Sequence, residues 1–60
     1  LREKEILQMM AKGLDFRIIG ESLNISYETV RTHVKRIYRK LHVSSRVEAV
    51  IKANQQNLLK

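Results

Sequence analysis

The spacing of apolar residues along the chain predicts that it is helical. Apolar side chains recur at intervals of three and four, which places them on one face of a helix, and short polar segments interrupt this pattern. Helices are expected over residues 2–12, 16–23, 27–41 and 45–55. The predicted fold class is therefore all-α, a four-helix bundle formed by a single domain of residues 1–60.

The residues at the ends of these segments are suited to starting and stopping helices. Asp15 and Ser26 precede the second and third helices and are favourable N-caps, and a serine at position 44 or 45 serves the fourth. Gly13 follows the first helix, where a left-handed backbone conformation commonly ends a helix. Asn24 follows the second helix and tolerates the positive φ of a tight turn.

Each predicted helix has an apolar face that indicates the core. The expected core residues are Ile6, Leu7, Met10 and Ala11, then Ile18, Ile19 and Leu23, then Val30, Val34, Ile37 and Leu41, and finally Ala49, Val50 and Ala53. The last helix has a second stripe at heptad-like spacing, formed by Val47, Ile51, Asn54 and Leu58. Because this stripe faces away from the core, it predicts a contact with a partner helix.

The third helix is basic on the side opposite its apolar face. That side contains Arg31, Thr32, Lys35, Arg36 and Arg39. The whole chain has a net charge of +6, from 12 Lys and Arg against 6 Asp and Glu, and residues 28–46 alone account for +5 of it. A positive charge concentrated in one segment, with the remainder nearly neutral, predicts a surface that binds a polyanion.

The second and third helices, joined by residues 24–26, meet the packing requirements of a helix-turn-helix unit. Gly20 supplies a small residue where the two helices cross, and Asn24 supplies the turn. The apolar residues that lock the helices together are Ile19, Leu23, Ile25 and Val30. Several independent requirements are met in register, which makes the pattern specific.

In such a unit the second helix enters the DNA major groove with its N-terminal half. Arg and Lys donate to guanine O6 and N7 there, and a Thr methyl group contacts the thymine methyl group. The predicted base contacts are Arg31, Thr32, Lys35 and Arg36. The predicted phosphate contacts are Arg17, Ser26, Tyr27, Thr29, Arg39 and Lys40.

Five stretches carry a resemblance to a known family. They are residues 2–7 (REKEIL), 11–14 (AKGL), 29–34 (TVRTHV), 39–41 (RKL) and 45–50 (SRVEAV). In their order and spacing the chain resembles the LuxR/FixJ-type, or NarL-like, helix-turn-helix domain at the C-terminus of many bacterial transcription regulators. One departure is Gly20, where the family usually has alanine.

The resemblance implies binding to double-stranded DNA by the third helix, with base contacts from Arg31, Thr32 and Lys35. It also implies a homodimer through the fourth helix, at least on DNA, with RNA polymerase as a further candidate partner. The chain is then expected to be the cytoplasmic C-terminal output domain of a longer regulator, preceded by a receiver domain or a ligand-sensing domain.

The composition argues against other chemistry. There is no cysteine, and no glycine-rich phosphate loop, carboxylate pair or Ser-His-Asp arrangement is visible, so no enzyme, cofactor, metal site or small-molecule ligand is expected. His33, Tyr27 and Tyr38 are expected to pack beside the core. An ion pair between Glu5 and Arg46 stays open. No apolar run is long enough to span a membrane.

Two other functions are compatible with the same pattern. One is a promoter-reading module like that of a sigma factor, although the sequence of residues 45–50 argues against it. The other is a protein-interaction module, in which the basic helix binds an acidic protein.

Overall fold

The computed structural model describes residues 2–59 and contains four helices in that range. They are α1 (Arg2–Ala11), α2 (Phe16–Leu23), α3 (Tyr27–Leu41) and α4 (Arg46–Gln55). Each boundary lies within one residue of the sequence prediction, and the predicted all-α fold is confirmed. Leu1 and Lys60, the two ends of the predicted domain, lie outside the described residues.

The helix ends have the predicted caps. The Asp15 carboxylate accepts a hydrogen bond from the Ile18 N–H at 2.9 Å, and the Ser26 hydroxyl accepts one from the Thr29 N–H at 3.1 Å. Of the two serines before α4, the one at position 45 is the N-cap. Gly13 and Asn24 have φ values of 87° and 58°, as expected of residues that end helices.

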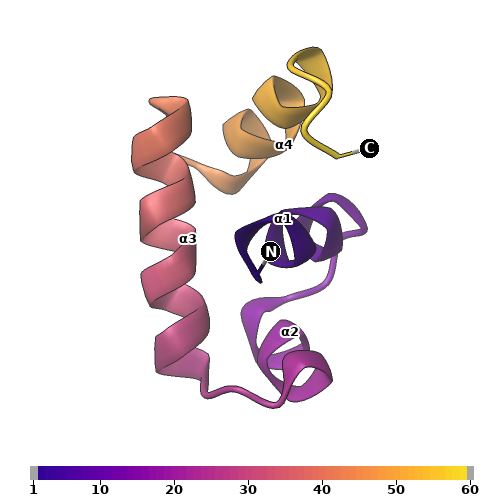
Figure 1. The fold of residues 1–60 in the computed structure, drawn as a ribbon, viewed down its shortest axis with the longest axis vertical. Coiled ribbons are helices and arrows are strands. Elements are labelled where there is room, and N and C mark those ends of the chain that lie inside the picture. Colours follow the sequence, from indigo (N-terminus) through magenta and orange to yellow (C-terminus); the bar gives the residue numbers. More distant parts are fainter. Residues whose placement is uncertain (1, 60) are drawn as a thin grey trace.

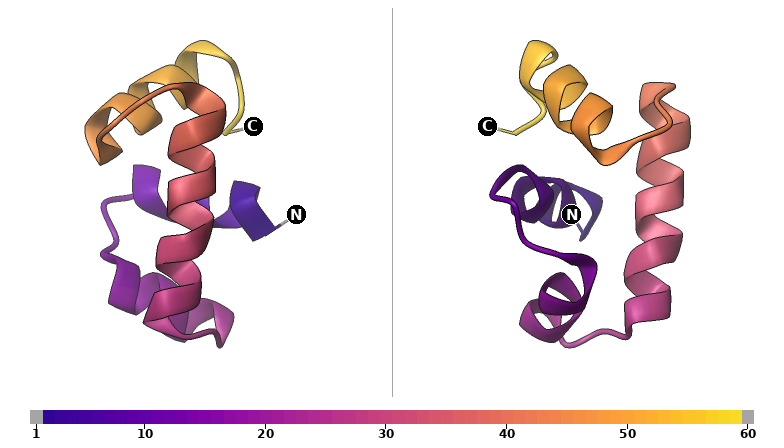
Figure 2. Two further views of the ribbon diagram at one scale, coloured as in Figure 1. Left: turned by 90° about the vertical axis from the view of Figure 1, so that its left-hand side faces the viewer. Right: turned by 180° about the vertical axis from the view of Figure 1, so that it is seen from behind.

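Helix α3 forms one side of the molecule, and the other three helices pack on its inner side. Figure 1 shows α4, α1 and α2 stacked in that order along α3, and the rotated views in Figure 2 agree. Four side chains of α3 are buried in this contact, namely Val30, Val34, Ile37 and Leu41. They meet buried residues of the other helices, namely Ile6, Leu7, Met10, Ile19, Ala49 and Ala53.

Of the predicted core residues, two are exposed and two others are only partly buried. Ala11 is exposed and Ile18 is 42% exposed, because each lies at the edge of a short helix that buries only its inner stripe. Val50 and Leu23 are only partly buried. Tyr27, expected beside the core, is 49% exposed because it begins α3 at the end of the bundle.

Leu58 does not continue the outward stripe of α4. The helix ends at Gln55, and Asn57 has a φ of 58°, which turns the chain. The tail then runs back over α1, where the Gln8 amide donates to the Leu59 carbonyl at 3.3 Å. Leu58 consequently lines a groove with Leu7 and Leu41 while remaining 38% exposed, and its contact with a partner helix stays a prediction.

Gly20 lies where α2 makes its closest approach to the turn and to α3. A Cβ atom at this position would stand 2.9 Å from the Ile25 carbonyl oxygen and 3.4 Å from Val30 Cγ2. The Ile25 N–H donates to the Gly20 carbonyl at 2.9 Å, which fixes the turn against the helix. The requirement for a small residue at the helix crossing is therefore confirmed.

Arg46 joins the start of α4 to the end of α1. Its guanidinium donates to the carbonyl of Met10 at 3.1 Å and also to the carbonyl of Leu14, and it lies 5.5 Å from the centroid of the Phe16 ring. The ion pair between Arg46 and Glu5, which the sequence left undecided, does not form. Glu5 Oε1 instead lies 3.7 Å from Arg2 Nη1. Arg46 thus ties the start of α4 to the last turn of α1 and to the loop that follows it.

We expect Arg46→Met to lower the free energy of unfolding by about 2 kcal/mol, because charge-assisted hydrogen bonds to partly buried carbonyls are lost. Arg46→Lys should be intermediate, since a lysine keeps a charged donor but lacks the flat guanidinium that lies over the Phe16 ring. Urea denaturation followed by circular dichroism measures both. Arg36→Met, on an exposed part of α3, is the matched control and should change stability by less than about 0.5 kcal/mol. Equal losses at the two positions would contradict this role.

Candidate nucleic-acid interface

The outer side of α3 is a continuous polar surface that no other helix covers. We call it the basic face; its members are Arg31, Thr32, Lys35, Arg36 and Arg39, and all are exposed. Figure 1 shows α1, α2 and α4 on the opposite side of α3. The five residues lie together because the apolar stripe of the same helix is turned toward the core, which forces the remaining positions outward.

The charges of the basic face are not neutralised within the protein. Among residues 2–59, ion pairs join Arg2 to Glu5 and Lys40 to Glu3, and neither involves this face. Four cationic side chains therefore project from one side of α3 without an acidic partner inside the described part of the chain. Such a surface attracts a polyanion and accelerates its approach.

The first turn of α3 presents hydroxyl groups next to this charge. The hydroxyls of Ser26 and Thr29 are 2.9 Å apart, so one donates to the other and the second hydroxyl keeps its proton free. The Thr32 hydroxyl donates to the Glu28 carbonyl at 3.1 Å. The Thr32 hydroxyl therefore has its proton engaged by the backbone, which leaves the methyl group and the acceptor side of the oxygen for an outside contact.

The start of α2 lies beside the start of α3. A surface hollow of about 650 Å³ is lined by Asp15, Phe16, Arg17, Tyr27 and Arg46. It brings together Arg17 and Tyr27, two predicted phosphate contacts that are ten positions apart in the sequence. The Asp15 carboxylate already accepts from the first turn of α2, so Arg17 is the remaining cation there without a carbonyl or carboxylate partner among the described residues.

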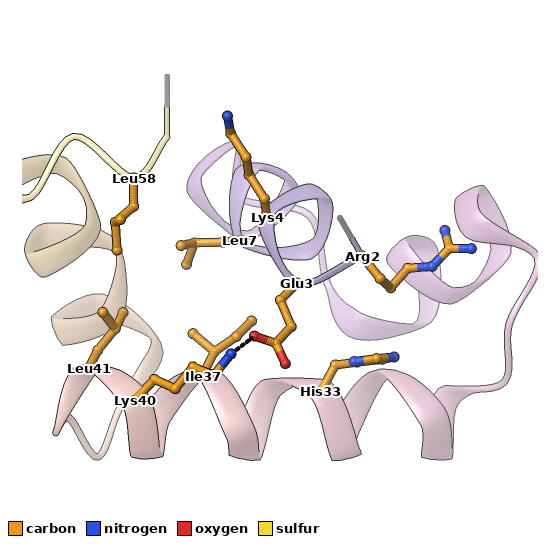
Figure 3. A pocket seen from close by; sticks show the side chains of 9 residues that line it. All are labelled: Arg2, Glu3, Lys4, Leu7, His33, Ile37, Lys40, Leu41 and Leu58. Atoms are coloured by element: carbon orange, nitrogen blue, oxygen red, sulfur yellow. Dashed lines mark hydrogen bonds and ion pairs between the residues drawn. The ribbon is translucent and has the colours of Figure 1, made fainter.

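Two basic residues that contribute to the charge of residues 28–46 are engaged inside the protein. Lys40 Nζ lies 2.7 Å from Glu3 Oε1, as Figure 3 shows, although the Lys40 side chain remains 68% exposed. Arg46 is turned inward toward the carbonyls at the end of α1. The positive charge of residues 28–46 that has no partner within residues 2–59 is therefore concentrated on Arg31, Lys35, Arg36 and Arg39.

His33 and Tyr38 lie on opposite flanks of the apolar stripe of α3. His33 is partly buried, and its Nδ1 atom has no hydrogen-bond partner among the described residues. It lines a groove of about 510 Å³ with Leu7 and Ile37 (Figure 3), which agrees with its predicted place beside the core. Burial raises the pKa of the Tyr38 phenol above its ordinary value of 10.0, and the positive charge of Arg46 partly opposes that shift.

Helix α4 has an apolar strip on its outer side. Val47 is 68% exposed and Ile51 is 52% exposed, and Asn54 is exposed on the same strip. Their outward position agrees with the sequence pattern. The strip ends there, because the chain turns after Gln55 and removes Leu58 from it.

Two contacts at this surface were not predicted. Arg31 Cζ lies 6.0 Å from the centroid of the Tyr27 ring, and the spacing of four positions on one helix would have indicated it. The pairing of Glu3 with Lys40 joins residues 37 positions apart. No local pattern indicates such a contact, because it depends on how α1 packs against α3.

Comparison with known proteins gives consistent matches. Residues 1–53 match the family model described as "Bacterial regulatory proteins, luxR family". The chain is 42% identical to the transcriptional regulatory protein DegU of Brevibacillus brevis over 59 residues, which are 98% of this chain and 25% of that protein.

Two further relatives are named as response regulators. The chain is 39% identical over 57 residues to the nitrate/nitrite response regulator protein NarL of Escherichia coli K12, covering 95% of this chain and 26% of that protein. It is 47% identical over 58 residues to the response regulator protein VraR of Staphylococcus aureus, covering 97% and 28%. The chain thus spans about a quarter of the length of these relatives. None of the helices in residues 2–59 has the length and apolar character needed to cross a membrane.

Proposed function

We propose that this chain, which belongs to the luxR family of bacterial regulatory proteins, reads a specific duplex sequence by placing the N-terminal part of α3 in the major groove. The family consists of helix-turn-helix DNA-binding regulators of transcription. The observation that carries this proposal is the basic face, which is open along α3 and has no acidic partner among residues 2–59. An α-helix of about 10–12 Å in diameter fits a major groove about 12 Å wide.

Four residues in the first two-thirds of α3 are assigned to base edges. Arg31, Lys35 and Arg36 donate to guanine O6 and N7, and the Thr32 methyl group contacts a thymine methyl group. All four side chains are exposed, and the cations have no ion-pair partner among residues 2–59. Specificity in this proposal comes from these four positions.

A second set of residues is assigned to the phosphate backbone on either side of the groove. It consists of Arg17, Ser26, Tyr27, Thr29, Arg39 and Lys40. The hollow shared by Arg17 and Tyr27, and the free hydroxyl proton of the capping pair, support contacts at the start of α3. Lys40 reaches a phosphate only by sharing or leaving its contact with Glu3, so its contribution is smaller than that of Arg39.

In a longer regulator this domain acts as the C-terminal output unit. The chain spans about a quarter of relatives that include two named response regulators. A receiver or ligand-sensing domain would then control access of α3 to DNA, and RNA polymerase would be the further partner on the promoter. Membership of the luxR family favours this arrangement over a sigma-factor module or an acidic-protein receptor.

We expect the alanine variants of Arg31 and Lys35 to lose about 1–3 kcal/mol of discrimination at individual base pairs. Arg39→Ala should weaken binding to every duplex equally, and should reduce the slope of log K against log salt by about one. A duplex selected from a random library with the wild-type protein, and its single-base-pair variants, are measured by fluorescence anisotropy at several salt concentrations.

Lys4→Ala is the matched control for loss of one charge. The Lys4 side chain points away from α3 (Figure 3), so affinity and discrimination should both stay at the wild-type level. The proposal fails if Arg31→Ala and Lys35→Ala bind the selected duplex as tightly and as selectively as the wild type does.

A pair of substitutions at Thr32 separates its methyl group from its hydroxyl group. Because the hydroxyl is bonded to the Glu28 carbonyl, Thr32→Val should keep the preference for thymine, whereas Thr32→Ser should lose about 1 kcal/mol of it. Binding of both variants to duplexes with thymine or uracil at the contacted position measures the effect, since uracil lacks the methyl group. The opposite order of the two variants would assign the contact to the hydroxyl.

We also propose that the outer strip of α4, with Val47, Ile51 and Asn54, joins two copies on a DNA site with two half-sites. Ile51→Glu places two carboxylates at this contact and should abolish cooperative binding to half-sites spaced by about 10 base pairs, while leaving binding to one half-site unchanged. Gel shifts with one or two half-sites measure this.

Ala11→Glu adds the same charge at an exposed position of α1 and serves as the matched control. It should keep the cooperativity of the wild type. Unchanged cooperativity in Ile51→Glu would remove α4 from the dimer contact and leave the DNA-reading role of α3 untouched.

A further inference from the structure

The Arg31 side chain lies over the ring of Tyr27, one turn earlier on α3. The distance from Arg31 Cζ to the ring centroid is 6.0 Å, at the outer edge of the range in which an aromatic face attracts a guanidinium. Long side chains on a helix lean toward its N-terminus, which brings residues four positions apart into contact. No ion pair competes for Arg31 in the described part of the chain.

From this contact we infer that Tyr27 is a positioning residue, which holds the Arg31 guanidinium ready to read a base pair. The inference rests on the proposed function, because it assigns Tyr27 to the act of base reading in which Arg31 takes part. It gives Tyr27 a role through its ring, in addition to the phosphate contact proposed for its hydroxyl.

The N-cap of α3 fixes the backbone from which the Tyr27 ring projects. It begins α3 directly after the N-cap, where the Ser26 hydroxyl holds the first turn at 3.1 Å from the Thr29 nitrogen. Half of the tyrosine surface is covered, since it is 49% exposed, and it shares its hollow with Phe16 and Arg17 at the start of α2. The ring therefore starts from a fixed backbone position and lies at the edge of this hollow.

A cation–π contact leaves the hydrogen-bond donors of Arg31 available. The ring attracts the flat side of the guanidinium, whereas the N–H donors lie in the guanidinium plane and remain free for guanine O6 and N7. Lys40 shows the contrast on the same helix, because the Glu3 carboxylate occupies one of its donors and neutralises its charge. An aromatic partner restrains a cation without occupying a hydrogen-bond donor or neutralising the charge.

The restraint also acts before DNA arrives. A long arginine side chain loses rotamer freedom when it binds, and a contact that already limits its rotamers reduces that loss. The next cation along the same side of α3, Lys35, repels Arg31 and favours a guanidinium that leans toward Tyr27 and the N-terminal end of the helix. That end is the part assigned to the groove.

The test compares the wild type with Tyr27→Phe, Tyr27→Leu, Arg31→Ala and the double variant Tyr27→Leu/Arg31→Ala on the selected duplex. The base pair read by Arg31 is the one whose substitution no longer matters in Arg31→Ala. Tyr27→Leu should weaken binding to the selected duplex by about two- to five-fold and reduce discrimination at that base pair. Tyr27→Phe keeps the ring and should keep the discrimination.

The double variant shows whether Tyr27 acts through Arg31. If it does, the double variant discriminates at that base pair no less than Arg31→Ala alone, because the ring has nothing left to position. Loss of the Tyr27 hydroxyl weakens binding to every duplex alike and does not enter this comparison. Additive losses of discrimination at that base pair, or equal losses of discrimination in Tyr27→Phe and Tyr27→Leu, would overturn the inference. A wild type that binds all duplexes alike defeats the proposed function itself, whereas full discrimination in Tyr27→Leu defeats only this inference.

A measurement without DNA checks the stack and the fold together. In proton NMR spectra the Arg31 side-chain resonances should be shifted by the ring current in the wild type and in Tyr27→Phe, and should lose that shift in Tyr27→Leu. The circular dichroism of all variants should be unchanged, because Tyr27 is half exposed at the first position of α3. Absence of the shift in the wild type would also overturn the inference.

Discussion

Burial of one side of α3 is the constraint on which the other features of this small domain depend. Val30, Val34, Ile37 and Leu41 form one buried stripe, against which three helices pack at different heights along α3. Burying one such side chain contributes about 1.5–3 kcal/mol. Like charges one turn apart on the opposite side, such as Arg31 and Lys35, oppose the helix by only about 0.2–0.5 kcal/mol per pair. The apolar stripe therefore outweighs the repulsion and sets the orientation of the helix.

Because that orientation is fixed, the cationic side chains of the basic face point toward solvent. The acidic residues that pair inside the described part of the chain, Glu3 and Glu5, both come from α1 and bind basic residues away from the basic face. Arg46 turns toward the carbonyls at the end of α1. The domain thus uses some of its basic residues to hold the bundle together and leaves others free on one side of one helix.

The local features of the fold were predictable because they depend on residues close in the sequence. The periodicity of α3, the caps at Asp15 and Ser26, and the crossing at Gly20 each need only a few neighbouring positions. The inward turn of Arg46 and the pairing of Lys40 with Glu3 were not predictable in this way. They join residues more than thirty positions apart, and the sequence pattern does not say which helix ends meet.

The same distinction explains the errors at exposed positions. Ala11 and Ile18 fit an apolar pattern, but a core of this size accommodates only one narrow stripe from each short helix. Leu58 fits the spacing of α4 but lies beyond the helix end, which the αL conformation of Asn57 creates without a glycine. For the basic face, exposure was predictable from the sequence, while the engagement of individual side chains required the packed bundle.

An NMR titration of the labelled protein with a selected DNA duplex tests the central claim most directly. The account predicts that side-chain and amide resonances of the basic face and of the start of α2 shift, while the methyl resonances of Val30, Val34 and Ile37 stay dispersed and nearly unchanged. Shifts centred on another surface of the bundle, or loss of the dispersed methyl resonances on binding, would contradict it. The first result would mean that DNA does not bind α3, and the second that α3 does not stay packed on the core when DNA binds.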